Sequence, residues 1–218
     1  IAGGNYTWTT SSPHPIGALE PHSAGDFGKE GDRVTTAKNR TWPLAQATEV
    51  AEELITLLRP ACERIEVAGS IRRKKGLVGD IELLVIPKGT IQSPLWLERE
   101  ALDRGVLELI TRGLVALRLN KKGASTFGPL NKLLVHVPSG IGVDLFSTTA
   151  ENFGMAWVVR TGPKEFNIKM MSRFKELGCQ GHAYAGITNQ DGKEIDCPDE
   201  ETVYRLLGWR FRPPEGRG

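Results

Sequence analysis

The chain has 218 residues and a mass of 23.9 kDa, enough for one or two domains with a buried core. Its 39% hydrophobic and 25% charged residues are typical of a globular protein and exclude a fibrous or disordered chain. We find no apolar run of about 18 residues and no basic start followed by an apolar core, so we expect no transmembrane helix, no signal peptide and no membrane partner. A formal net charge of +2 is compatible with nucleic-acid binding without arguing for it.

Residues 1–40 are dominated by Gly, Ser, Thr, Pro and His without an apolar period, which predicts a flexible or irregular N-terminal arm. The alternative is the remnant of a DNA-holding element. From Thr41 the pattern changes, with Thr41 as the expected N-cap and Pro43 in the first turn of a helix. Apolar residues then recur at helical spacing as far as Leu58, and Pro60 ends the helix.

The middle of the chain alternates short β-rich runs with one helical segment. Strands are expected at residues 64–68, 81–86, 114–119, 132–137 and 141–146, and a helix at 94–112. In the last third we expect helices at 151–159, 163–177 and 199–208, with a small β element that turns at residues 189–192. The sequence therefore predicts an α+β fold, in which a mixed sheet domain with helices on one side (41–149) precedes a small helical and β subdomain (150–218).

Three carboxylates are the most informative feature of the sheet region. Asp80 and Glu82 lie on one face of a strand because side chains alternate along it, and we expect Asp144, on a later strand, to stand beside them. Acids gathered at one point raise one another's pKa unless cations neutralise them. Divalent ions with oxygen ligands are the natural partners, and two of them activate a hydroxyl and stabilise a leaving pyrophosphate. A solvated strand face would show the same spacing.

A Gly69-Ser70 turn precedes the first two acids. Glycine lets backbone N–H groups approach a phosphate, Ser70 adds a hydroxyl, and Arg72 or Arg73 adds a forked cationic donor. The turn therefore predicts a triphosphate beside the carboxylates.

This order of Gly-Ser and Asp-x-Glu resembles the nucleotidyltransferase superfamily that includes DNA polymerase beta. Arg160-Thr161-Gly162-Pro163-Lys164-Glu165-Phe166-Asn167 resembles the threonine-glycine turn and downstream asparagine of family X DNA polymerases. The end of the chain, residues 200–209 and 213–217, is similar to the closing helix and tail of that family. The resemblance spans residues 41–217.

The resemblance implies a palm domain and a C-terminal nucleotide-binding subdomain, with roles for ten residues. Two Mg²⁺ ions, for which Mn²⁺ can substitute, are implied at the catalytic acids Asp80, Glu82 and Asp144, with Asp144 nearest the primer 3′-hydroxyl and the candidate acceptor of its proton. The implied triphosphate contacts are Gly69, Ser70, Arg73 and Gly79. The implied sugar and base contacts are Thr161, Gly162 and Asn167.

The implied activity is a monomeric DNA polymerase that adds deoxynucleoside monophosphates from dNTPs to a DNA 3′ end, as in the repair of short gaps. A template-weak, terminal-transferase-like enzyme is a close alternative. A small-molecule or protein nucleotidyltransferase and a catalytically weakened nucleic-acid-binding module also stay open. Three widely spaced cysteines give neither metal-ligand spacing nor a disulfide framework, so we expect a reducing intracellular compartment, cytoplasm or nucleoid, with a viral origin left open.

The chain departs from the family pattern at four places. Glu82 stands where aspartate is usual, Val159-Arg160 where a large aromatic is usual, and Gly142 where many members carry a basic residue near the primer. Residues 1–40 supply no helix-hairpin-helix domain. Because arginine is flexible, we expect Arg160 to reach water or a phosphate and ribonucleotides to be excluded only weakly. The alternative is that the backbone of Thr161-Gly162 alone excludes ribonucleotides.

Other polar and aromatic residues have ordinary structural interpretations. We expect packing roles for His136, Trp157 and Trp209. Lys121, Lys122 and Lys132 belong either to a solvated hairpin or to contacts with nucleic-acid phosphates.

Overall fold

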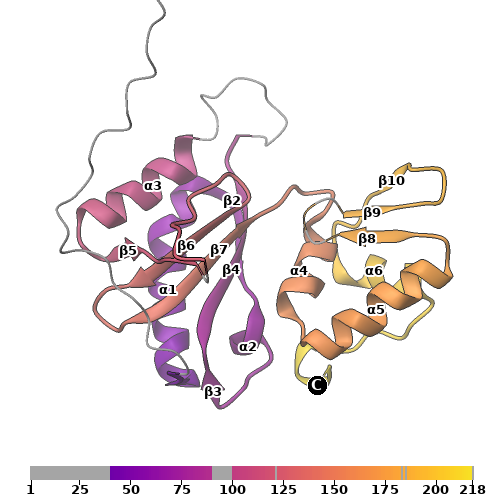
Figure 1. The fold of residues 1–218 in the computed structure, drawn as a ribbon, viewed down its shortest axis with the longest axis horizontal. Coiled ribbons are helices and arrows are strands. Elements are labelled where there is room, and N and C mark those ends of the chain that lie inside the picture. Colours follow the sequence, from indigo (N-terminus) through magenta and orange to yellow (C-terminus); the bar gives the residue numbers. More distant parts are fainter. Residues whose placement is uncertain (1–39, 90–99, 121, 183, 185, 218) are drawn as a thin grey trace, which may run out of the picture. The chain divides into compact units, whose positions relative to one another are not determined.

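The computed structural model describes residues 40–89, 100–120, 122–182, 184 and 186–217 (Figure 1). Residues 33–218 form one compact unit by themselves, and all described residues belong to it. The expected N-terminal arm apart from Arg40, the first six residues of the helix expected at 94–112, and Lys121 lie outside the described residues. Among the described helices, none is both long and apolar enough to span a membrane.

A five-stranded mixed sheet forms the first half of the described chain. Its strand order is β2-β4-β7-β6-β5. The strands are β2 (Cys62–Val67), β4 (Asp80–Pro87), β5 (Val115–Leu117), β6 (Asn131–His136) and β7 (Ile141–Ser147). Within this sheet β4 and β7 run parallel and the other neighbours are antiparallel, so the predicted mixed sheet is confirmed.

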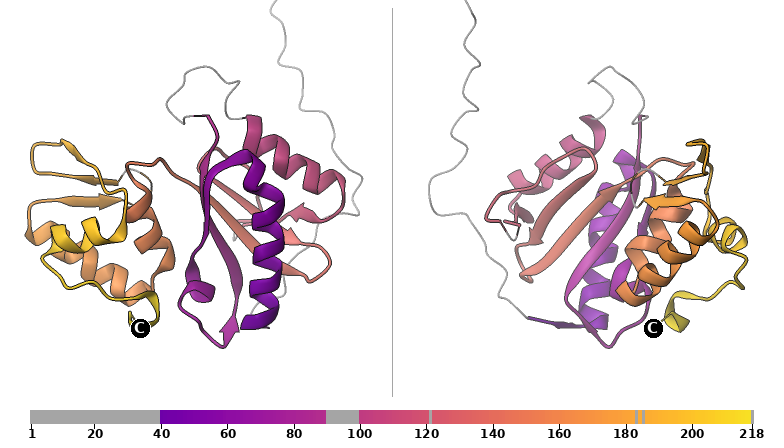
Figure 2. Two further views of the ribbon diagram at one scale, coloured as in Figure 1. Left: turned by 180° about the vertical axis from the view of Figure 1, so that it is seen from behind. Right: turned by 45° about the vertical axis from the view of Figure 1, so that its right-hand side comes forward.

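Helices α1 (Leu44–Leu58) and α3 (Glu100–Thr111) cover one face of this sheet (Figure 2). Their apolar sides pack in one core with Ile81, Leu83 and Leu145, the strand residues that point away from the acids. The expected N-cap at Thr41 is wrong. Trp42 is buried and pairs with Val78 in a two-stranded ladder, β1 (Trp42–Pro43) with β3 (Leu77–Val78), so α1 begins only after Pro43.

The C-terminal region has its own apolar core. Its helices are α4 (Phe153–Thr161), α5 (Lys164–Glu176) and α6 (Glu200–Leu207), and its strands are β8 (Gln180–His182), β9 (Gly186–Thr188) and β10 (Glu194–Ile195). Phe166, Met170 and Tyr204 are among the buried residues between them. The side chain of Asp199 accepts a hydrogen bond from the Thr202 amide at the start of α6, as expected for an N-cap. The fold is therefore α+β, as predicted.

Helix α4 covers part of the second face of the sheet. Phe153 and Ala156 pack against Leu84 and Phe146, which lie on the same face as the acids, farther along β4 and β7. The expectation that helices lie on one side of the sheet is therefore incomplete. These apolar positions need cover because exposing them to water is unfavourable.

A buried carboxylate connects the sheet region to the C-terminal helices. Glu200 of α6 is only 3% exposed and receives two hydrogen bonds each from Arg217, both 2.9 Å, and from Arg72, 2.6 and 2.7 Å. Arg72 belongs to α2 (Gly69–Arg72), and its guanidinium lies 3.4 Å from the ring centre of Trp157 on α4. Burial alone would raise the pKa of Glu200, but the hydrogen bonds from Arg72 and Arg217 lower it.

We expect the Glu200 carboxylate to contribute strongly to the stability of the fold. Glu200→Gln leaves two partly or fully buried guanidinium groups without their anion, so we expect a loss of about 3–5 kcal/mol in the free energy of unfolding. The matched control is Glu201→Gln, at the exposed neighbouring position. Urea unfolding measures both, and equal small losses for the two variants would contradict the role of the cluster.

Candidate active site

The three predicted carboxylates share one face of the sheet. Glu82 on β4 is the direct register partner of Asp144 on β7, and Asp80 is the partner of Gly142. Residues Ile81 and Leu83 between them point into the helix-covered core, as the alternation predicted. Parallel pairing of β4 and β7 therefore brings Asp144 beside the two acids of the Asp-x-Glu sequence, 62 positions after Glu82.

The environment of these acids disfavours their charged forms. Burial, and after it the negative charges of Asp80 and Asp144, raise the pKa of Glu82 from 4.5 to about 8, although Arg160 and Arg73 oppose the shift. Burial also raises the pKa of Asp144 from 3.8 to about 6, against the effect of Arg118. Mutual repulsion of this kind is relieved by bound cations.

The acids fit divalent ions in type, although they are not gathered into a ligand cluster. No group of three or more acidic, His or Cys side chains stands close enough to hold an ion in the described part of the chain. The Glu82 carboxylate lies against Gly69, and Arg118 donates a hydrogen bond to Asp144. Three carboxylates on adjacent strands are suitable oxygen ligands for Mg²⁺ once the side chains turn toward one ion.

The Gly-Ser turn forms the first residues of helix α2. Gly69 has a φ of +61°, and a side chain there would collide with the Glu82 carboxylate, so both the backbone and the space require glycine. Ser70 and Arg73 extend from this short helix toward the pocket described below. The short basic segment expected after Ser70 is thus partly helical. The prediction that Arg72 donates to a phosphate is wrong, because both terminal nitrogens of its guanidinium donate to Glu200.

The α4–α5 turn faces this helix. Gly162 between the helices has a φ of +66°, which favours glycine. Arg73 donates to the carbonyl oxygen of buried Thr161, and Arg72 donates to the Thr161 hydroxyl at 2.8 Å. The Asn167 side chain donates to the carbonyl oxygen of Val159 at 2.8 Å. The turn that the sequence singled out is therefore anchored both to α2 and to its own helices.

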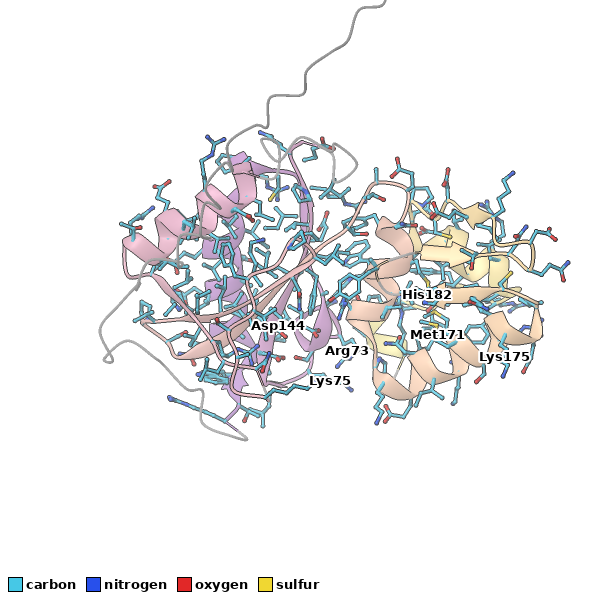
Figure 3. The ribbon with its side chains drawn as sticks, turned by 45° about the horizontal axis from the view of Figure 1, so that its top comes forward. Arg73, Lys75, Asp144, Met171, Lys175 and His182 are labelled. Carbon is cyan, nitrogen blue, oxygen red and sulfur yellow. The ribbon has the colours of Figure 1, made fainter. Side chains whose placement is uncertain are left out.

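One pocket, with a volume of 680 Å³, joins these elements. Residues from the sheet, α2, the α4–α5 turn and α5 line it, including seven of the ten predicted site residues: Ser70, Arg73, Asp80, Glu82, Thr161, Gly162 and Asn167. Among the residues labelled in Figure 3 are Asp144 on the sheet, Arg73 after α2 and Met171 on α5. Gly69, Gly79 and Asp144 do not line the pocket.

Three buried polar atoms of the pocket residues have no hydrogen-bond partner among the described residues. They are Nε of Arg73, Nε of Arg160 and Oδ1 of Asn167. Buried polar groups are normally paired, and leaving one unpaired costs about 1–3 kcal/mol. The polar groups of these three residues are therefore incompletely paired beside the pocket that the residues line.

Arg160 is held by aromatic rings rather than free. Its guanidinium lies 3.7 Å from the ring centre of Phe146 and 4.5 Å from that of Tyr184, and its charge lowers the pKa of Glu82 and Asp144. The expectation of a flexible side chain is wrong, because the rings confine it. The expected contact of Arg160 with a phosphate and the weak exclusion of ribonucleotides stay predictions.

The remaining sequence candidates have structural roles. Trp157 donates to the carbonyl oxygen of Val67 and Trp209 packs against Phe166, so their packing roles are confirmed. His136 is buried and lies 3.4 Å from Glu53 of α1. Both expectations for Lys132 are wrong, since it is 1% exposed and pairs with Asp103 of α3 at 2.7 Å, facing away from the acids.

Comparison with protein families matches residues 156–218 to the DNA polymerase beta thumb. The match contains Thr161, Gly162 and Asn167 and relates this region to the thumb of a family X polymerase, which supports the expected relationship for the last third of the chain. The carboxylates lie outside the matched residues. No curated protein matches the chain.

The raised pKa of Glu82 predicts how stability depends on pH. Between about pH 4.5 and 8 the unfolded chain loses the Glu82 proton while the folded chain keeps it, so in metal-free buffer stability falls as pH rises. Glu82→Gln removes this penalty, so at pH 8 its free energy of unfolding should exceed that of wild type by about 1 kcal/mol or more. Its melting temperature should then be roughly 2–4 °C higher. Glu63→Gln, at an exposed position of β2, is the control. Equal melting temperatures of wild type and Glu82→Gln at pH 8 would contradict the burial of this charge.

Proposed function

We propose that the protein is a nucleotidyltransferase that adds deoxynucleoside monophosphates from dNTPs to a DNA 3′-hydroxyl. The observation that carries the proposal is the 680 Å³ pocket, which two acids, the Gly-Ser helix and the Thr-Gly turn line together. A triphosphate, a sugar and a base need different partners in one place, and these elements offer them.

The proposed nucleotide lies across the pocket with its phosphates toward α2. Ser70 supplies a hydroxyl, and Arg73 supplies a charged donor whose Nε has no partner among the described residues. Thr161, Gly162 and Asn167 line the pocket on the proposed sugar and base side.

Asp80, Glu82 and Asp144 are the residues that would hold two Mg²⁺ ions, and Mn²⁺ would fit the same oxygen ligands. Such ions supply charge stabilisation for the transferring phosphoryl group and lower the pKa of the attacking hydroxyl. The protein's own contribution is to keep three carboxylates on one rigid pair of strands, where β4 and β7 fix their spacing. Glu82 replaces an aspartate of the family, and its longer side chain turns back onto Gly69.

In the proposed reaction the 3′-oxygen of the acceptor bonds to the α-phosphorus of the dNTP. The bond from that phosphorus to its bridging oxygen breaks, and pyrophosphate leaves with the electron pair. Asp144 is the proposed acceptor of the hydroxyl proton. The thumb match supports DNA as the acceptor over a small molecule or a protein.

Removing the carboxylate of either Asp80 or Asp144 tests the proposed reaction. Asp80→Asn and Asp144→Asn keep the side-chain shape but lose an ion ligand, so we expect primer extension to fall by about a thousandfold or more, roughly 4 kcal/mol in the barrier. Asp191→Asn, in the exposed β9–β10 turn, is the control and should extend primers like wild type.

The assay compares recessed, gapped and single-stranded DNA, each with Mg²⁺ and each dNTP. Extension of gapped DNA alone supports gap filling, whereas extension of single strands supports the template-weak alternative. Activity of Asp80→Asn within tenfold of wild type would refute the carboxylate assignment.

A further inference from the structure

Arg118 lies on the same face of the sheet as the acids, although it is distant from them in sequence. It directly follows β5 and its amide bonds to the Leu133 carbonyl oxygen, while Leu133 is the register partner of Asp144 and Asp144 that of Glu82. One row therefore crosses the sheet from the end of β5 to β4 and contains Arg118, Leu133, Asp144 and Glu82 in this order. The cation lies at the β5 edge of the sheet, and the two acids lie on β7 and β4.

The Arg118 side chain spans this row to reach Asp144. Its Nη2 donates to Oδ1 of Asp144, and its Nε donates to the Leu134 carbonyl oxygen at 3.3 Å. The two ion-paired side chains are only 18% and 17% exposed, so water screens the pair weakly. The contact is therefore a partly buried, charge-assisted hydrogen bond, stronger than a typical surface ion pair.

Gly142 leaves the space that this contact needs. A Cβ atom at position 142 would lie 3.4 Å from Nε, 3.6 Å from Cζ and 3.7 Å from Cδ of Arg118, so a larger side chain would displace the guanidinium. Gly142 is also the register partner of Asp80. The missing side chain thus gives Arg118 its approach to the acids, and its charge lowers the pKa of both Asp80 and Asp144.

The other cations that act on the acids have different anchors. Arg73 donates to the Thr161 carbonyl oxygen, and Arg160 lies over the rings of Phe146 and Tyr184. Among the described residues, Asp144 forms its ion pair with Arg118. Oδ1 of Asp144 therefore already has a guanidinium partner in this structure, whose described residues contain no metal-ligand cluster.

We propose that Arg118 is a positioning residue and an internal counter-ion of the carboxylate site, which competes with a divalent cation for Asp144. It holds Asp144 oriented in the row while no ion is bound, and a divalent cation must displace the Arg118 hydrogen bond to use Oδ1. The inference rests on the proposed function in that the three acids are taken as the ion-binding groups. It adds a residue that sets how tightly and in which orientation that site takes its ion.

The test measures Mn²⁺ binding to the full chain by electron paramagnetic resonance, without nucleotide or DNA. Arg118→Met keeps the apolar stem and removes the competing charge, so Mn²⁺ should bind about tenfold more tightly than to wild type. Arg112→Met removes the same charge at an exposed position of the chain that pairs only loosely with Glu108, 3.8 Å away, and should bind Mn²⁺ like wild type. Asp144→Asn combined with Arg118→Met should lose the gain.

Two further variants keep the proposal falsifiable if Arg118→Met folds poorly. Arg118→Lys retains the charge and should bind Mn²⁺ nearly as wild type does. Gly142→Leu, whose atoms beyond Cβ would occupy the space of the guanidinium, should tighten Mn²⁺ binding by a smaller factor than Arg118→Met. Unchanged or weaker Mn²⁺ binding in both Arg118→Met and Gly142→Leu would overturn the proposal, as would a failure of every protein to bind Mn²⁺.

Kinetics separate positioning from a merely structural role. Arg118→Met should lower the Mg²⁺ concentration that gives half the maximal rate of nucleotide addition by about tenfold, with the KM for dNTP unchanged, because the cation no longer has to displace the guanidinium from Asp144. An unchanged Mg²⁺ requirement in a variant that is folded like wild type would contradict the role. If wild type transfers no nucleotide to any acceptor, the proposed function fails, while the Mn²⁺ measurements still decide the role of Arg118.

Discussion

The Glu200 carboxylate, shared by two arginines, is the interaction on which the pocket depends. Arg72 reaches it from the Gly-Ser helix and Arg217 from the end of the chain, so one buried anion connects segments 128 positions apart. The same Arg72 contacts Trp157 and the Thr161 hydroxyl on α4. Because residues of α2 and of the α4–α5 turn line the pocket together, the cluster holds two of its walls in contact.

A second balance of charge operates on the sheet. Asp80, Glu82 and Asp144 are buried enough that burial leads the rise in their pKa, and arginines from three separate elements oppose it. Each of these arginines is itself restrained, Arg118 by a backbone carbonyl, Arg73 by the Thr161 carbonyl and Arg160 by aromatic rings. Restrained arginines thus partly neutralise the acids in the absence of an ion, and a divalent cation that binds the acids takes over this neutralisation.

Local patterns allowed much of this to be predicted from the sequence. Alternation placed Asp80 and Glu82 on one strand face, and the apolar run of β7 placed Asp144 on a neighbouring strand. Helix ends at Asp199 and Gly208 followed from capping preferences, since these residues satisfy terminal backbone groups locally. The Thr41 cap failed because Trp42 packs and pairs with a distant strand, which overrides a local preference.

The arginine partners could not be predicted, because each depends on contacts between distant segments. Arg72 and Arg73 are adjacent in sequence, yet one is committed to Glu200 and the other lines the pocket. Arg118 belongs to the strand expected at residues 114–119, and the register of β5, β6 and β7 brings it to Asp144. Counting the hairpin register from residues 115–119 and 131–137 was the one sequence signal that could have found it.

Hydrogen–deuterium exchange shows whether α2 and the α4–α5 turn form one nucleotide pocket. The full chain is compared with and without Mg²⁺ and a dNTP, in the absence of an acceptor strand. We expect the amides of residues 69–73 and 161–167 to exchange more slowly together when the nucleotide is present. Slower exchange in only one of these two segments, or in neither, would show that they do not form one nucleotide pocket.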